Sequence, residues 1–257
     1  MFDAMIKELS VLPQVEAIAL GGSRAGTVYD EKSDYDIYLY CTAPVTEDAR
    51  KEILSKYCSF VEYSNHYWEL EDNGTFNNGV DFDLLFRNLD DFTADVASVV
   101  ECHQARNGYT TCMWHNLLTC KILYDENGRL KAAKDRFSVP YPQELKQNIV
   151  SRNRTLLRGS MPAYEDQIKK AVKRHDLVSI NHRVAAFMES YFDLLFALNE
   201  QTHPGEKRLM QLCIDRCRIL PKNFQANLMQ LFTHLYTKPE MIAGDLDIIL
   251  SELEKIL

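Results

Sequence analysis

The sequence predicts an α+β protein, in which a mixed β-sheet with flanking helices is followed by an all-α helical bundle. Two observations predict this class. Short runs rich in β-forming residues alternate with helical periodicity as far as Pro140, and after the break at Pro140-Tyr141-Pro142 no segment alternates with period two. The remaining pattern predicts five or six helices. We therefore expect two domains, residues 1–140 and residues 141–257.

The first elements follow from apolar spacing. Residues 2–11 have apolar side chains at helical spacing, and the helix is expected to stop before Pro13. Val15–Leu20 is an apolar run short enough for a buried strand, and residues 34–40 alternate and are rich in β-formers. Thr46, followed by two acidic residues, is typical of a helix start, and helical spacing continues through residues 49–57.

Further elements are expected on both sides of the break. Strands are predicted at residues 60–63, 66–70 and 80–86, and the clusters Asp72-Asn73-Gly74 and Asn77-Asn78-Gly79 predict turns between them. Helices at 90–106 and 110–118 and a strand at 121–125 complete the first domain. Residues 179–199 predict a long helix whose broad apolar stripe faces a core.

Charge and cysteine content limit the kinds of protein that this chain is expected to be. The chain contains 37 acidic and 29 basic residues, a formal net charge of -8, which argues against a nucleic-acid or membrane-surface binder. Up to Pro140 there are 23 acids and 13 bases, so the acidic surplus lies in the first part. Seven cysteines, an odd number, accompany an N-terminus without a signal-peptide pattern, and we expect reduced thiols and a cytoplasmic protein. No transmembrane span is predicted.

The most informative block joins Gly21-Gly22-Ser23 to Asp34 and Asp36. Residues two apart on a strand share a face, so the two aspartates should lie about 6 to 7 Å apart at their backbones. Two negative charges at so short a distance favour a cation between them, and Mg²⁺ prefers carboxylate oxygens. Glycines allow backbone N–H groups to approach an anion, and Ser23 adds a donor. Arg24 and Lys32 supply positive charge nearby, and Arg24 is expected to help bind the nucleotide.

A third acid is expected from the strand at residues 80–86. Asp81 and Asp83 lie on one face of that strand, and three acids from neighbouring strands suit two metal ions across a transferring phosphoryl group. Both aspartates remain candidates at this point.

These glycine and aspartate residues resemble the signature of a known superfamily. The segment GGSRAGTVYDEKSDYDIYLY, residues 21–40, resembles the signature of the DNA polymerase β-like nucleotidyltransferase superfamily: Gly-[Gly/Ser]-Ser, a spacer, Asp-x-Asp, and a later Asp. The chain length and helical C-terminal half are similar to aminoglycoside and lincosamide nucleotidyltransferases and to a bacterial family of unknown function, DUF4037. KILYDENGRL (121–130) and ALNEQTHPGEKRLM (197–210) resemble segments of these relatives.

The resemblance implies a nucleotidyltransferase-type sheet and a role for each matching residue. Gly22 and Ser23 would contact the β- and γ-phosphates of a nucleoside triphosphate. Asp34 and Asp36 would bind two Mg²⁺ ions. Asp83 would ligate the ion nearer the acceptor and help deprotonate its hydroxyl, because the family places this acid before an apolar run and a basic residue. If Asp81 is the ligand instead, Asp83 is a supporting or surface acid.

In the helical half, Lys207 follows Pro204-Gly205 at an expected helix start. Lys207 could be an ordinary exposed surface cation or could contact phosphate, and the resemblance favours the phosphate contact. The helical domain would then close the substrate cleft over nucleotide and acceptor.

The expected function is Mg²⁺-dependent transfer of a nucleoside monophosphate, AMP from ATP, to a hydroxyl of a small molecule, with release of pyrophosphate. An aminoglycoside or lincosamide antibiotic is the acceptor that the resemblance suggests, which implies antibiotic resistance. Two alternatives are a protein-nucleotidylating, antitoxin-like enzyme and a non-catalytic nucleotide-binding protein. No nucleic acid is expected as acceptor, since no long basic track is present. Monomer and homodimer are both open.

Overall fold

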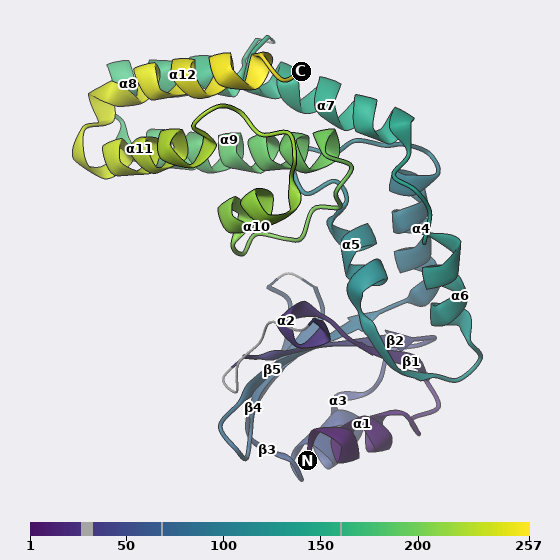
Figure 1. The fold of residues 1–257 in the computed structure, drawn as a ribbon. Coiled ribbons are helices and arrows are strands. Elements are labelled where there is room, and N and C mark those ends of the chain that lie inside the picture. Colours follow the sequence, from purple (N-terminus) through teal and green to yellow (C-terminus); the bar gives the residue numbers. More distant parts are fainter. Residues whose placement is uncertain (27–32, 68, 160) are drawn as a thin grey trace. The chain divides into compact units, whose positions relative to one another are not determined.

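The computed structural model describes residues 1–26, 33–67, 69–159 and 161–257 (Figure 1). Its contacts divide the chain into two compact units: Met1–Ala97 with Asn116–Val139, and Ser98–His115 with Pro140–Leu257. The predicted domains, 1–140 and 141–257, differ from these units at residues 98–115. That segment groups with the helical unit because Thr110 donates two hydrogen bonds to the Asp193 carboxylate, from its backbone N (2.9 Å) and its Oγ1 (2.7 Å).

The first unit contains a six-stranded mixed sheet, so the predicted α+β class is confirmed. In chain order the strands are β1 Val15–Leu20, β2 Tyr35–Cys41, β3 Cys58–Asn65, β4 Glu71–Phe76, β5 Asp81–Arg87 and β6 Lys121–Asp125. Across the sheet the order is β3-β4-β5-β2-β1-β6. β2 and β5 are parallel, and the other neighbouring pairs are antiparallel. The parallel pair brings together two strands that are far apart in sequence.

Helices pack against both faces of this sheet. The helices that begin in this unit's residues are α1 Phe2–Leu9, α2 Gly22–Ala25, α3 Glu47–Leu54, α4 Leu89–Val100 and α6 Arg129–Arg136. Side chains of α1 and α3, including Met5 and Ile53, share a buried core with Ile37 of β2 and Leu84 of β5. Successive side chains along a strand point to opposite faces. Asp36 is next to Ile37, and Asp83 is next to Leu84, so both aspartates lie on the face opposite this core. Thr46 caps α3 as predicted, accepting from the Ala49 backbone N at 3.4 Å.

One predicted turn is a strand. Asp72-Asn73-Gly74 lies inside β4, and the strand expected at residues 66–70 does not form over the described part of that range. Tertiary contacts outweigh the turn preference here. Asp72 is fully buried, forms an ion pair with Arg50 and accepts from the backbone N of Ser64 at 2.8 Å. Gly74 is required by close packing, since a β-carbon there would lie 2.6 Å from Cζ of Phe82.

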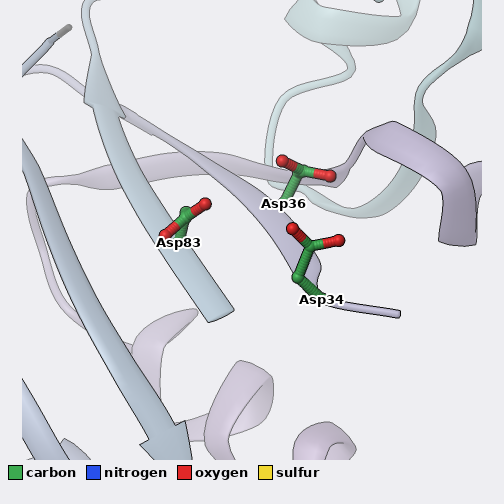
Figure 2. A group of neighbouring side chains, drawn as sticks. All are labelled: Asp34, Asp36 and Asp83. Carbon is green, nitrogen blue, oxygen red and sulfur yellow. The ribbon is translucent and has the colours of Figure 1, made fainter. Parts of the chain in front are cut away.

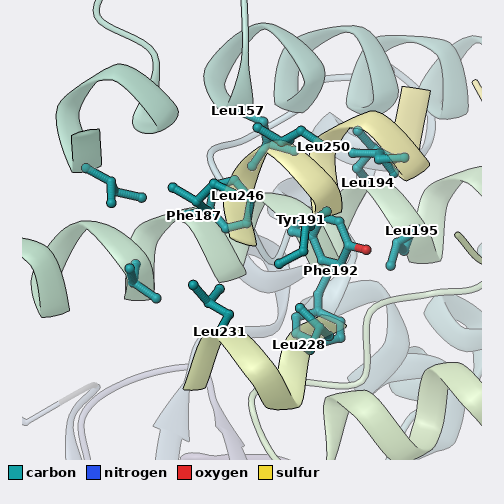
Figure 3. Close-up of a cluster of buried hydrophobic side chains, with 14 of the residues drawn as sticks. Leu157, Phe187, Tyr191, Phe192, Leu194, Leu195, Leu228, Leu231, Leu246 and Leu250 are labelled. Carbon is teal, nitrogen blue, oxygen red and sulfur yellow. The ribbon is translucent and has the colours of Figure 1, made fainter. Parts of the chain in front are cut away.

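The second unit is a helical bundle, as the sequence predicts. Its elements are α7 Gln143–Leu157, α8 Tyr164–Lys173, α9 Leu177–Leu198, α10 Leu209–Arg216, α11 Phe224–Thr237, the 3₁₀ turn η1 Pro239–Met241 and α12 Ile242–Glu254. The boundary between the units, at His115 and Asn116, falls in the middle of α5 Cys112–Thr119. The apolar stripe of α9 is core, and Figure 3 shows Phe187 and Tyr191 packed among leucines of α7, α11 and α12. Among the described residues, no helix combines the length and the apolar character that a membrane span requires.

Candidate metal and nucleotide site

Three aspartates predicted as metal ligands lie together near the N-terminal ends of the parallel strands β2 and β5. Asp36 of β2 lies directly opposite Asp83 of β5 in the strand register, and Asp34 immediately precedes β2. One carboxylate oxygen from each lies within 4.8 Å of the others, and all three side chains are half-buried. Figure 2 shows them projecting from neighbouring strands into the same space. Three negative groups at this separation repel one another in the absence of a cation.

The glycine turn after β1 packs directly against this cluster. The backbone N of Gly21 donates to the carbonyl of Asp36 at 2.8 Å, and a β-carbon on Gly21 would lie 2.2 Å from Cε2 of Tyr38. Gly22 has a φ of +58°, and a β-carbon there would lie 1.7 Å from Oδ2 of Asp36. Ser23 follows in the single turn α2. Both glycines are therefore needed for the turn to approach β2 this closely.

This donor set fits a hard divalent cation. Carboxylate oxygens from three separate positions match the ligands that Mg²⁺ accepts while it keeps positions for water and substrate phosphate. The turn beside Asp36 leaves no room for a side chain at Gly22, so the space next to the carboxylate is bordered by backbone. Asp34, Asp36 and Asp83 are the residues that would hold the ion.

The two candidate acids on β5 differ in their surroundings. Asp83 belongs to the three-aspartate cluster, whereas Asp81 is exposed and its Oδ1 accepts from Oγ1 of Thr75 at 2.7 Å. The strand register explains the difference, because Asp83 is the residue opposite Asp36. The structure therefore groups Asp83, not Asp81, with the Asp-x-Asp pair.

Two polar residues of β4 next to Asp83 were not predicted. Nδ2 of Asn73 donates to Oδ1 of Asp83 at 2.6 Å. Glu71 is 5% exposed, and burial, together with the negative charge of Asp83, raises its pKa. Asn73 lies in the turn that residues 72–74 were expected to form, and Glu71 immediately precedes that turn. The available signal was the period-two polar pattern of Glu71, Asn73 and Thr75, which places all three on one strand face.

Arg24 contacts the segment that leads into β2. Its Nε donates to the carbonyl of Ser33 at 2.6 Å, and its guanidinium lies 4.0 Å from the centre of the Tyr35 ring. Arg24 therefore contacts the residues on both sides of Asp34. The predicted role of Arg24 in nucleotide binding stays a prediction, and Lys32 lies outside the described residues.

Lys207 belongs to the second unit. It is exposed in the turn before α10, which begins at Leu209, two residues later than expected. The loop that carries it is anchored: the backbone N of His203 donates to Oγ1 of Thr111 at 2.7 Å, and Gly205 N donates to Nδ1 of His203 at 3.2 Å. The phosphate-binding role of Lys207 stays a prediction.

Comparisons with known proteins find two solved structures and one family model that are similar to this chain. The solved structures of a nucleotidyltransferase-like protein from Exiguobacterium sibiricum 255-15 (12% identity, TM-score 0.42, 97% of this chain and 71% of that chain) and of an aminoglycoside 6-adenyltransferase from Bacillus subtilis (9%, 0.31, 99% and 89%) are similar to the chain at low level. No curated protein matches it. Residues 109–209 match the model of the domain of unknown function DUF4037, which confirms the predicted resemblance to that family over this part of the chain.

Proposed function

We propose that the protein is a Mg²⁺-dependent nucleotidyltransferase that transfers AMP from ATP to a hydroxyl of a small molecule and releases pyrophosphate. The observation that carries the proposal is the joint placement of Asp34, Asp36 and Asp83 beside the Gly21-Gly22 turn. A carboxylate cluster supports cation binding, and an adjacent backbone turn supports phosphate binding.

Each residue of the site has a distinct task in this reaction. Asp34, Asp36 and Asp83 would hold two Mg²⁺ ions, and the backbone of Gly22 with the hydroxyl of Ser23 would bind the β- and γ-phosphates. When bound, the ions would offset negative charge on the attacking and departing oxygens. The acceptor oxygen forms a bond to the α-phosphorus. At the same time the bond between the α-phosphorus and the oxygen that links it to the β-phosphate breaks, so that pyrophosphate leaves. Asp83 would receive the hydroxyl proton, since it lies on the strand next to the pair.

The proposed acceptor is an aminoglycoside or lincosamide antibiotic, which would make the protein a resistance enzyme. The resemblance in the first domain supports this choice. The excess of acids over bases before Pro140, 23 against 13, is compatible with a cationic acceptor.

The test incubates the protein with Mg²⁺, ATP labelled on its α-phosphate, and a panel of aminoglycosides and lincosamides. Label on one antibiotic, with an equal amount of pyrophosphate, supports the proposal. Label on a protein band instead identifies a protein acceptor, and ATP binding in calorimetry without pyrophosphate identifies a non-catalytic binder. The control is the double variant Asp34→Asn, Asp36→Asn; pyrophosphate release that survives in it contradicts the metal assignment.

A further inference from the structure

A chain of three hydrogen bonds leads from a backbone amide to Asp83. The backbone N of Tyr67 donates to Oδ1 of Asn65 at 2.9 Å, and Nδ2 of Asn65 donates to Oδ1 of Asn73 at 2.9 Å. Nδ2 of Asn73 then donates to Oδ1 of Asp83 at 2.6 Å. Asn65 ends β3 and Asn73 lies in β4, so the chain crosses from the edge of the sheet to the carboxylate cluster.

The first donor fixes the direction of this series of hydrogen bonds. A backbone N–H can only donate, so the side-chain atom of Asn65 that it meets must be the oxygen. The amide nitrogen of Asn65 therefore faces Asn73, whose oxygen must accept, and the nitrogen of Asn73 must face Asp83. The orientation of both amides thus follows from Tyr67 and does not depend on how their oxygen and nitrogen atoms are assigned.

We propose that Asn73 is a positioning residue for the metal-binding carboxylate of Asp83, and that Asn65 sets its orientation. The inference rests on the proposed function, because it assumes that Asp83 binds a cation. Asn73 holds Oδ1 of Asp83 and leaves Oδ2 as the atom for the cation. Hydrogen-bonded partners of ligating carboxylates orient them in this way in metal sites generally.

Asn73 also separates two like charges. Its amide interacts with the buried carboxyl of Glu71 as well as with Asp83, and the two acids repel each other. The position therefore calls for a hydrogen-bond donor, and asparagine supplies one without adding charge.

The adjacent rung of the same strands offers a matched control. Oγ1 of Thr75 donates to Oδ1 of Asp81 at 2.7 Å, so Asn73 and Thr75 each bind an aspartate across the β4–β5 pair. Only Asp83 belongs to the cluster. Asn73→Leu and Thr75→Val each remove one cross-strand donor while keeping much of the side-chain volume.

The first experiment measures binding of Mn²⁺, as a probe for the cation, to the full chain by isothermal titration calorimetry. We expect Asn73→Leu to weaken binding about 10- to 100-fold, and Thr75→Val to bind as the wild type does. Circular dichroism checks that each variant is folded. Equal affinity of Asn73→Leu and wild type would overturn the inference.

The second experiment changes Asn65, which lies outside the cluster. It tests the positioning role of Asn73 even if Asn73→Leu does not fold. Asn65→Asp presents only acceptors to Asn73, so the amide of Asn73 turns over and directs its oxygen at Asp83. We expect weaker Mn²⁺ binding, although the added negative charge by itself would strengthen it. Asn65→Ala leaves Asn73 free to keep donating and should change affinity less than Asn65→Asp does. Tighter binding in Asn65→Asp would contradict the proposed orientation.

The wild-type titration separates the two proposals. If the wild type binds no Mn²⁺, the proposed function fails and the inference fails with it. If the wild type binds Mn²⁺ and neither Asn73→Leu nor Asn65→Asp weakens binding, the inference alone fails and the metal-dependent function stands.

Discussion

The carboxylate of Asp36 occupies the place where a side chain on Gly22 would begin, since a β-carbon on Gly22 would lie 1.7 Å from Oδ2 of Asp36. The backbone bond from Gly21 N to the carbonyl of Asp36, at 2.8 Å, holds the two segments together. The glycine turn and the Asp-x-Asp strand are therefore one structural unit. A change in the turn acts directly on the carboxylate.

Gly22→Ala should abolish Mn²⁺ binding or weaken it more than 10-fold, because the new methyl group displaces the Asp36 carboxylate. The left-handed φ of +58° adds strain of about 1 to 2 kcal/mol for any non-glycine residue. Calorimetric titration measures the affinity, and urea unfolding measures the strain.

Gly128→Ala is the control for that strain. Gly128 has a φ of +69°, and a β-carbon added there would have no atom of the described residues within 4 Å beyond its chain neighbours. It should lose similar stability and bind Mn²⁺ normally. Normal binding by Gly22→Ala would mean that Asp36 does not need its observed position.

Asp83→Asn and Asp81→Asn form a second matched pair, two residues apart on one strand face. Asp83→Asn should weaken Mn²⁺ binding at least 10-fold and remove AMP transfer, because it takes one anionic ligand from the cluster. Asp81→Asn should change neither by more than about twofold, since Asp81 is exposed and binds Thr75. The same titration and label-transfer assay test both. The reverse ranking would move the third ligand to Asp81.

The glycine turn and the aspartate pair were predictable because their signals are local. Gly21-Gly22-Ser23 follows an apolar run that matches β1 residue for residue, and the alternation of residues 34–40 predicts β2 to within one residue. Strand alternation alone also predicts that Asp34 and Asp36 share a face. Strand alternation alone leaves Asp81 and Asp83 equivalent, and only the family resemblance favours Asp83. The β2–β5 register that sets Asp83 opposite Asp36 relates strands more than 40 residues apart.

β4 could not be predicted for a related reason. Its Asp72-Asn73-Gly74 has the composition of a turn, and each residue is kept in the strand by a distant partner: Arg50 for Asp72, Asp83 for Asn73, and the ring of Phe82 beside Gly74. Asn73 therefore enters the site through contacts that turn propensity hides. In the same way, the bond from Thr110 to Asp193, 83 residues apart, assigns residues 98–115 to the helical unit.

Arg50→Met should destabilise the protein by about 3 to 5 kcal/mol, because it leaves the Asp72 carboxylate buried without its cation. Arg50 also donates to Oγ of Ser64 at 2.9 Å, so the change loosens the junction of α3, β3 and β4. Adding Asp72→Asn should recover part of that stability by removing the buried charge. Urea unfolding of both single variants and the double variant measures the coupling. Additive losses would show that the pair is energetically independent.

Asp193 gives the stability of the helical unit a defined pH dependence. Burial raises its pKa to about 6 from an ordinary 3.8, although hydrogen bonds from Thr110 and Asn153 favour the charged form. The folded state therefore holds this proton more tightly than the unfolded chain does. As pH rises from about 4 to above 6, the wild type should lose about 2 kcal/mol relative to Asp193→Asn, which does not titrate.

Urea unfolding of wild type and Asp193→Asn at pH 4, 5, 6 and 7 measures this difference. Other titrating groups contribute equally to both proteins, so the change in the difference with pH reports Asp193 alone. The amide accepts fewer of the three donated bonds, and that loss lowers the stability of the variant by an amount that does not vary with pH. A difference that moves in favour of the wild type as pH rises would mean that the donors of Thr110 and Asn153 outweigh burial, and that the carboxylate binds its proton less tightly in the folded protein.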